Sequence, residues 1–246
     1  MAEKPQILPL NYSYHMASMI YRSIQRGDST LSLYLHQPRK IKFFTFSKLM
    51  AEKRKIERDK LEIEGTTFFK FSSPRKDIVA ALVNGLLEKP EVEIANADFI
   101  ISSIEVLKEK EIKEKETFVT LSPISVTTVK GNNGYRKTID LYPDEPKFYE
   151  NLKKNLIKKY MLLYGKEPEN KEMDIKVIKA KPKRIKIKNT YHRCTEMVFE
   201  ARGSKELLSV GYQAGFGERN SMGFGMVKVA RQSRKAEEEK AAEGGG

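Results

Sequence analysis

The chain has 246 residues, 39% of them hydrophobic, which is enough to bury one large or two small globular cores. It has one cysteine, no apolar signal sequence and no run near the roughly 18 apolar residues of a membrane helix, so disulfide-rich, secreted and membrane-spanning classes are excluded and a cytoplasmic protein is predicted. The formal net charge of +13 favours a polyanionic partner, above all nucleic acid, over the alternative of a lysine-rich thermophilic surface.

The first half of the chain has the element order of a βαββαβ unit. Residues 11–27 are predicted to form an amphipathic helix that Gly27 ends, because apolar residues recur at intervals of four. A second helix is predicted at 76–89 by the same spacing. Strands are predicted at 41–47, 66–73 and 98–109, and a charged connection at 48–64.

The second half repeats this order after a charged run at 109–116, which is interpreted as a domain boundary or a solvated strand extension. The predicted elements are a strand at 117–129, a helix at 146–165, a strand pair at 173–188 and 194–203, a short helix capped by Ser204, and a strand at 224–229. The order predicts an α+β fold of two tandem ferredoxin-like domains. We expect these domains at 1–116 and 117–230, and a disordered tail at 231–246.

A basic segment, residues 176–188, contains no acidic residue. In a strand, Arg184, Lys186 and Lys188 would share one face, with cations roughly 6–7 Å apart, a spacing that suits the phosphates of an extended nucleic acid. Pro182 indicates an edge or a bulge. The alternative is a lysine-rich edge that prevents aggregation. The nucleic-acid contacts predicted here are Lys179, Lys181, Lys183, Arg184, Lys186 and Lys188.

A second unusual segment, 211–229, is rich in glycine but matches neither a phosphate-binding P-loop nor a dinucleotide fingerprint. Backbone N–H groups exposed by glycine, together with a neighbouring arginine, would suit phosphates or base edges. A plain glycine-rich turn is the alternative. The contacts predicted in this loop are Gly215, Gly217, Arg219, Asn220, Gly223 and Gly225.

The three histidines, His15, His36 and His192, are each more often structural than catalytic when taken alone. Their spacing offers no metal site, and no paired carboxylates suggest hydrolysis. The sequence therefore predicts no metal and no cofactor, and any chemistry should be acid–base chemistry.

Several of these segments together resemble one known family. They are "FFTFSKLMAEKR", "AALVNGLLEKPEVEI", "TFVTLSPISVT", "AKPKRIKIK" and "VGYQAGFGERNSMGFGMVKV". The chain is similar to the CRISPR-associated endoribonucleases that process precursor crRNA, the sixth Cas family within the RAMP superfamily, and most of all to archaeal, Thermococcales-like members. The resemblance implies two ferredoxin-like domains that bind CRISPR repeat RNA, and a metal-independent cut within the repeat. In that reaction the 2′-hydroxyl attacks the adjacent phosphate and leaves 2′,3′-cyclic phosphate and 5′-hydroxyl ends.

The resemblance also implies a catalytic site made of Tyr21, His36 and Lys42, with His36 in the loop after the first helix. An imidazole, whose ordinary pKa is about 6.5, moves either proton of such a reaction near neutral pH. An ammonium stabilises the developing negative charge. The division of acid and base between tyrosine and histidine stays open at this stage.

The chain departs from the family pattern at its start, where only "MAEKPQIL", interrupted by Pro5, precedes the first helix, so the first strand is expected to be short or missing. The family implies a monomer or homodimer that hands crRNA to an effector complex and does not bind membranes. Two alternatives are a non-catalytic repeat-RNA-binding protein of the same family and a DNA-binding or ribosomal accessory protein.

Overall fold

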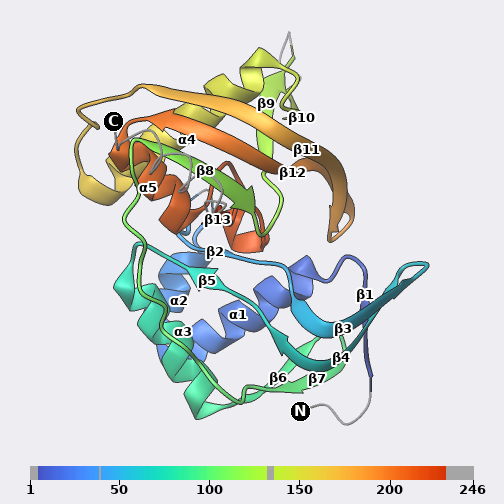
Figure 1. Ribbon diagram of the computed structural model, residues 1–246. Coiled ribbons are helices and arrows are strands. Elements are labelled where there is room, and N and C mark those ends of the chain that lie inside the picture. The colour runs from blue at the N-terminus through green and yellow to red at the C-terminus, as the bar shows by residue number, and fades with distance from the viewer. Residues whose placement is uncertain (1–4, 39, 132–135, 231–246) are drawn as a thin grey trace, which may run out of the picture.

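The computed structural model describes residues 5–38, 40–131 and 136–230, so the predicted tail at 231–246 lies outside the described residues. The chain forms two α+β domains, one above the other in Figure 1, and each packs helices against an antiparallel sheet. The predicted tandem ferredoxin-like fold is confirmed. Among the described residues, no helix is long and apolar enough to cross a membrane.

The first domain is built on a sheet of order β1-β4-β3, to which α1 and α3 contribute the helical layer. Gly27 of α1 and Gly85 of α3 let these helices touch, since a Cβ on Gly85 would lie 1.8 Å from the Ser23 carbonyl oxygen. The elements are β1 (Gln6–Pro9), α1 (Ser13–Gly27), α2 (Ser29–His36), β2 (Thr45–Phe46), β3 (Met50–Glu57), β4 (Lys60–Phe68), β5 (Phe71–Ser72), α3 (Lys76–Glu88), β6 (Glu91–Ile94) and β7 (Ala97–Ile100). β2 pairs with β5, and β6 with β7.

The first strand of this domain is short, but it pairs with a neighbouring strand. β1 is four residues long, runs antiparallel to β4 and packs beside β7. Leu8 of this strand is fully buried. The expectation of a short first strand is confirmed, and its absence is excluded.

Three other expectations for the first domain are wrong in detail. The charged connection at 48–64 is most of the hairpin β3–β4. The side chains of β3 are largely exposed and show no alternation, whereas Leu61 and Ile63 of β4 alternate into the core. Residues 29–36 form the unpredicted helix α2, which Asp28 caps by accepting a hydrogen bond from the Leu31 N–H at 2.8 Å. The strand predicted at 98–109 ends at Ile100.

The second domain has a sheet of order β11-β12-β8-β13, the order expected of a ferredoxin-like unit. Ser204 caps α5 as predicted, by accepting from the Leu207 N–H. Gly165 ends α4 in the left-handed conformation. The elements are β8 (Lys115–Thr120), β9 (Val126–Lys130), β10 (Lys137–Leu141), α4 (Pro146–Tyr164), β11 (Met173–Ile187), β12 (Thr190–Gly203), α5 (Lys205–Ala214), the 3₁₀ turn η1 (Asn220–Met222) and β13 (Val227–Val229).

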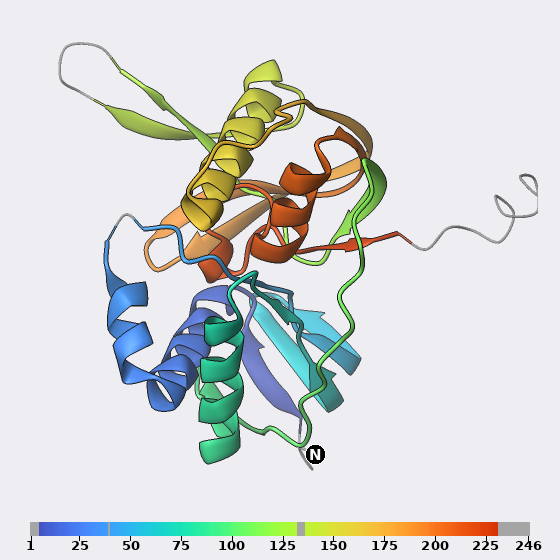
Figure 2. The same ribbon diagram turned by 90° about the vertical axis from the view of Figure 1, so that its left-hand side faces the viewer.

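Two features of this domain differ from the predicted pattern. The strand expected at 117–129 is divided into β8 and β9, and β9 pairs with β10 in a hairpin that extends away from the domain in Figure 2. The final strand is shorter than expected, because residues 224–226 precede β13 without regular structure. The long pair β11–β12 is confirmed, with an irregularity between Val177 and Lys179.

The two domains have separate hydrophobic cores, and they meet at an interface that contains both apolar contacts and hydrogen bonds. Met222 of η1 packs against the first core. The Thr45 hydroxyl donates to the Phe224 carbonyl at 2.9 Å, and the Lys48 N–H donates to the Leu121 carbonyl at 3.1 Å. The interface therefore joins β2 and the residues after it to the glycine-rich segment and to the residues that follow β8. The boundary at 116 stays a prediction.

Candidate active site and nucleic-acid interface

Two of the three predicted catalytic residues lie in contact. Tyr21 is in the middle of α1 and His36 is the last residue of α2, and their ring centroids are 5.1 Å apart. The Phe44 ring meets the Tyr21 ring edge-on, with centroids 5.5 Å apart. His36 is thus the end of a helix and not part of a loop, because the Asp28 cap starts a new helix that returns along α1.

The imidazole of His36 is oriented by its own helix. Its Nδ1 lies 2.8 Å from the carbonyl oxygen of Ser32, which only accepts hydrogen bonds, so Nδ1 carries a proton and donates it. In the neutral ring, this leaves the Nε2 lone pair free. Because the side chain is exposed, Nε2 is open to a substrate proton.

The phenol of Tyr21 is half-buried, and burial is the main reason why its pKa is raised above 10.0. A hydrogen bond from Ser221 of the second domain acts in the opposite direction. The phenol is therefore protonated near neutral pH and suited to donate a hydrogen bond.

Lys42 is tied to the residue that follows the histidine. Its Nζ donates to the Gln37 carbonyl at 2.5 Å. Burial, followed by the nearby charge of Lys40, lowers the pKa of the Lys42 ammonium. Phe43 has a φ of 54°, a left-handed conformation that an aromatic residue seldom adopts, so the backbone at this corner is strained. The structure thus places the Lys42 ammonium next to the end of α2, and its catalytic role stays a prediction.

The predicted basic contacts of β11 lie on both faces of the strand. The register sets Lys179, Lys181 and Lys183 opposite one set of β12 side chains, and Arg184 and Lys186 on the other face. Lys188 follows the strand, in the turn. The exposed members are Lys179, Lys181, Arg184 and Lys188, whereas Lys183 and Lys186 are half-buried.

Some of these cations have partners within the protein. The Lys183 ammonium lies 3.6 Å from Glu196. The Arg184 guanidinium stacks 4.2 Å from the ring centroid of Tyr191. Lys188 lies over Tyr14 of the first domain, 5.4 Å from its centroid. The tip of the β11–β12 hairpin therefore reaches the start of α1 and adds charge at the junction of the domains.

The glycine-rich loop is organised differently from the expectation. Gly215, Gly217, Gly223 and Gly225 all have positive φ and are buried. A Cβ on Gly217 would lie 2.4 Å from the Ser125 carbonyl oxygen, and one on Gly223 would lie 2.8 Å from the Phe46 ring. What comes close to these glycines is the rest of the protein, so the requirement for glycine is internal and the prediction that RNA lies against them is not supported.

The polar side-chain atoms of Asn220 also form hydrogen bonds within the protein. It is buried, and its amide donates to the carbonyl oxygens of Phe216 and Phe224 at 3.2 and 3.0 Å. Its side-chain oxygen accepts from the Lys159 ammonium at 2.7 Å. We therefore correct the prediction of Asn220 as an RNA contact: its side chain holds the loop together.

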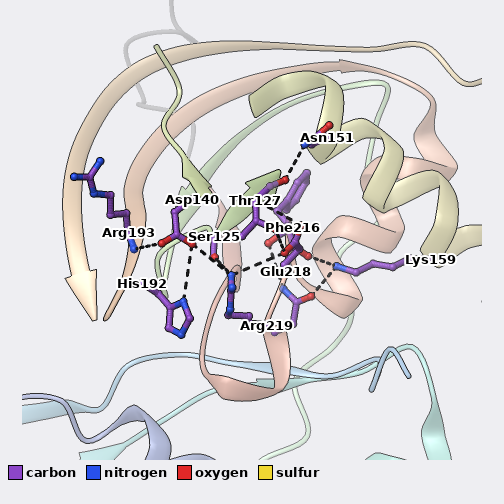
Figure 3. A network of polar contacts seen from close by, with 12 residues as sticks. Ser125, Thr127, Asp140, Asn151, Lys159, His192, Arg193, Phe216, Glu218 and Arg219 are labelled. Atoms are coloured by element: carbon purple, nitrogen blue, oxygen red, sulfur yellow. Dashed lines mark hydrogen bonds and ion pairs between the residues drawn. The ribbon is translucent and has the colours of Figure 1, made fainter. Parts of the chain in front are cut away.

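Lys159 was not predicted, although the sequence contains its signal. It follows Phe148, Leu152 and Leu156 on the same face of α4, where a lysine is unusual. It is buried, and its ammonium also donates to the carbonyl oxygens of Gly215 and Gly217, at 2.6 and 2.8 Å (Figure 3). Burial lowers its pKa to about 7, and Glu218 opposes this shift.

Arg219 belongs to a second polar network beside the loop. Its guanidinium donates to the Ser125 hydroxyl at 2.8 Å and lies 3.7 Å from Asp140. His192 lies 3.9 Å from the same carboxylate, and burial lowers the pKa of His192, followed by the charge of Arg219 (Figure 3). The positive charge of Arg219 is thus partly neutralised within the protein. Because its side chain is half-buried and not enclosed, the RNA contact at Arg219 stays a prediction.

His15 lies apart from both networks, with its ring 5.9 Å from that of Tyr14, among the residues that line a shallow cavity with Lys186 and Lys188. In the described part of the chain, no three His, Cys, Asp or Glu side chains are grouped as ligands for a metal ion.

Both halves of the chain match models of known protein families. The family model described as "CRISPR-associated protein Cas6, N-terminal" matches residues 7–105, and "CRISPR associated protein Cas6, C-terminal" matches 107–229. The CRISPR-associated endoribonuclease Cas6 of Pyrococcus furiosus is 42% identical over 94% of this chain and 88% of its own length. The CRISPR-associated endoribonuclease Cas6 1 of Methanocaldococcus jannaschii is 41% identical, over 90% and 87%.

A solved structure described as an RAMP protein binding different RNA substrates is 36% identical and superposes with a TM-score of 0.85, covering 94% of this chain and 96% of that one. Sequence and fold thus agree over nearly the whole length of both proteins. With both halves of the family pattern present in order, this chain belongs to the Cas6 family of CRISPR-associated proteins.

Proposed function

We propose that this protein is a metal-independent endoribonuclease that cuts precursor crRNA within the CRISPR repeat. The observation that carries the proposal is the contact of Tyr21 with His36, whose imidazole is fixed through Nδ1 and open at Nε2. The names of the curated relatives support an endoribonuclease acting in a CRISPR system.

The proposed reaction uses an oxygen of the RNA itself. Nε2 of His36 removes the proton of the 2′-hydroxyl, and that oxygen forms a bond to the adjacent phosphorus. The bond from phosphorus to the 5′-oxygen breaks, and this oxygen takes a proton from the Tyr21 phenol. Lys42 stabilises the charge of the crowded phosphorane. The imidazolium then returns its proton to the phenolate, and the products carry 2′,3′-cyclic phosphate and 5′-hydroxyl ends.

The RNA is proposed to reach the site along the exposed cations of β11. Lys179, Lys181, Arg184 and Lys188 are exposed, and the hairpin leads toward the start of α1, the helix that carries Tyr21. Such contacts position the phosphate backbone without reading its bases. We further propose that the cut RNA passes to a crRNA effector complex.

The proposal is tested by single-turnover cleavage of repeat RNA at saturating protein. His36→Ala should slow cleavage about 10²- to 10⁴-fold, the usual effect of losing a general base, with unchanged affinity for a 2′-deoxy repeat. His15→Ala, which changes a histidine one helix away, is the matched control and should cut at the normal rate. An unchanged rate for His36→Ala would remove this residue from the site.

Two further measurements test the chemistry. A repeat with hydrogen in place of the 2′-hydroxyl at the cut should bind and stay intact, since the attacking oxygen is missing. Cleavage should continue in EDTA. Loss of cleavage in EDTA, or 3′-hydroxyl and 5′-phosphate ends, would overturn the mechanism.

A non-catalytic RNA-binding protein is the second candidate, because the exposed cations of β11 would serve binding alone. A repeat RNA that binds in a salt-dependent manner and is never shortened would favour it.

A further inference from the structure

The end of α2 carries an aromatic ring that two cations share. Tyr34, two residues before His36, is half-buried and packs against the first hydrophobic core. The Lys40 ammonium lies over its ring, 4.5 Å from the centroid, and the Arg75 guanidinium lies 5.1 Å from the same centroid. Both distances are within the roughly 6 Å of a cation–π contact. The ring therefore holds two cations close to the histidine that the proposed reaction uses.

The two cations differ in how much charge they offer to a ligand. Arg75 is bound to the Asp77 carboxylate, to which its Nε donates at 3.1 Å and its Nη2 donates as well. Its charge is thus largely neutralised within the protein. Lys40 is exposed and, among the residues that the structure describes, forms no ion pair with a carboxylate. Because a ring face accepts no conventional hydrogen bond, the Lys40 ammonium keeps N–H donors for an anion from outside.

Lys40 is also close to the proposed catalytic lysine, Lys42. Two residues of chain span at most about 7 Å between Cα atoms, so the two side chains start from neighbouring positions. The Phe43 carbonyl accepts from the Ser73 hydroxyl at 2.7 Å, and that hydroxyl accepts from the Arg75 N–H at 3.1 Å. These bonds tie the corner that carries both lysines to the start of α3.

Two neighbouring ammonium groups repel each other. The charge of Lys40 is the second cause, after burial, that lowers the pKa of Lys42. The Lys42 ammonium donates to the Gln37 carbonyl at 2.5 Å, whereas Lys40 has no acceptor of this kind within the described ranges. An anion bound at Lys40 would offset the repulsion. The phosphates of an extended RNA strand, roughly 6–7 Å apart, match the spacing of the two lysines and supply one negative charge for each.

We infer that Lys40 binds the RNA phosphate next to the one that is cut, and that the Tyr34 ring holds its ammonium there. Lys42 then meets the scissile phosphate and Lys40 meets its neighbour, which fixes the position of the cut along the strand. This inference rests on the proposed function, because it places the RNA at His36 and Lys42.

The deciding variant is Lys40→Ala, measured by binding of the 2′-deoxy repeat so that cleavage does not interfere. The affinity should fall about 5-fold, the upper range for one exposed charge pair, and the slope of log affinity against log salt should fall by about 0.7. Lys40→Arg keeps the charge and should restore both values. Lys89→Ala is the matched control and should change neither, because this exposed lysine follows the far end of α3, about 20 Å from Arg75.

Repeats with one neutral phosphate locate the contact. Each phosphate near the cut is replaced in turn by a methylphosphonate, which has no charge. Where the neutral group is next to the cut, Lys40→Ala should cause no further loss of affinity, whereas a distant neutral group should leave the full loss. Tyr34→Leu, which removes the ring face, should weaken binding with the same dependence on phosphate position, and Tyr34→Phe should not.

An unchanged salt slope in Lys40→Ala, or an equal loss of affinity with every methylphosphonate, would overturn the inference. Failure of the proposed function looks different, because the wild-type chain would then bind the repeat without cutting it. In that case coupling of Lys40 to a single phosphate would still support the contact, and the absence of such coupling would overturn it.

Discussion

The glycine-rich loop and the strand β11 are the two segments in which the sequence predicts RNA contacts, and they have opposite environments. The four glycines of the loop are buried against protein atoms, whereas Lys179 and Lys181 of β11 are exposed. A run of cations without acids is costly to bury, so its exposure follows from charge alone. A cluster of glycines shows only that something approaches closely, and here it is the protein itself.

The lysines of the two regions show the same contrast. Lys159 satisfies its three N–H groups inside the loop, while the cations of β11 leave most of theirs to solvent. We therefore expect changes in the loop to alter stability, and changes on β11 to alter RNA binding. The following measurements test this division, in order of the expected change in stability.

Gly225→Ala should have the largest effect. Its Cβ would lie 2.0 Å from the Phe216 carbonyl oxygen, and the residue has a φ of +78°. Because both the backbone conformation and the contact resist a side chain, the free energy of unfolding should fall by about 4 kcal/mol or more, measured by urea denaturation. A loss below about 1 kcal/mol would show that the loop is adaptable.

Lys159→Met should come second. It fills the same space but leaves the carbonyl oxygens of Gly215 and Gly217 and the Asn220 oxygen without their donor. The expected loss is about 2–4 kcal/mol in the free energy of unfolding. A Met variant as stable as the wild type would show that the buried ammonium costs as much as its hydrogen bonds return.

The pH dependence of the free energy of unfolding should reveal the lowered pKa of Lys159. Its pKa is about 7 in the folded protein and 10.5 as the ordinary value, so between these two pH values the unfolded chain holds a proton that the folded chain lacks. The free energy of unfolding should therefore receive a contribution that rises with pH across this window, on the order of a few kcal/mol. It is fully present above 10.5 and lost as pH falls through about 7.

Urea unfolding of wild type and Lys159→Met at about pH 7 and about pH 9 isolates this contribution as the difference between the two slopes. Equal slopes would mean that the three oxygen acceptors keep the ammonium protonated throughout.

Gly165→Ala is the matched control for Gly225 and should have a smaller effect. Gly165 also has a positive φ, +68°, but a Cβ there would meet no atom within 4 Å. The expected loss is about 1 kcal/mol, the conformational cost alone. A loss as large as that of Gly225→Ala would mean that conformation, and not close packing, dominates in the loop.

Lys179→Ala and Lys181→Ala should change the free energy of unfolding by less than about 0.5 kcal/mol, because both side chains are exposed. Each should reduce the slope of log affinity against log salt by about 0.7 for single-stranded repeat RNA. Lys154→Ala, an exposed lysine of α4 paired with Glu150, is the control and should leave the slope unchanged. Equal slopes in all variants would remove β11 from the RNA path.

Much of the fold could be predicted because apolar residues recur at helical spacing in α1, α3 and α4. The helix α2 could not, since Leu31, Leu33 and Leu35 alternate like a strand, and Leu33 is 74% exposed in the structure. The hairpin β3–β4 was missed because β3 is almost wholly exposed and shows no period, and because the short alternation of Leu61 and Ile63 in β4 lies within a run of charged residues.

The candidate site was less accessible from sequence than the fold. No spacing rule joins Tyr21 to His36 across two helices, so only the family resemblance named the pair. Ser221 lies far from both along the chain, and it affects the pKa of Tyr21 only because the turn η1 packs against α1. Lys159 was detectable as a charge on an apolar face, but its partners depend on how the loop folds back.

The short length of α2 affects the fraction of molecules in which His36 faces Tyr21 at any one time. It spans eight residues, which is too short to be stable in isolation, and it carries His36 at its last position, where helices fray first. The Asp28 carboxylate and the buried Leu31 and Leu35 therefore set the fraction of molecules in which the imidazole faces Tyr21. On the proposed mechanism, the cleavage rate is the intrinsic rate multiplied by that fraction, so Asp28, eight positions before His36 in sequence, adjusts the rate through the helix it caps.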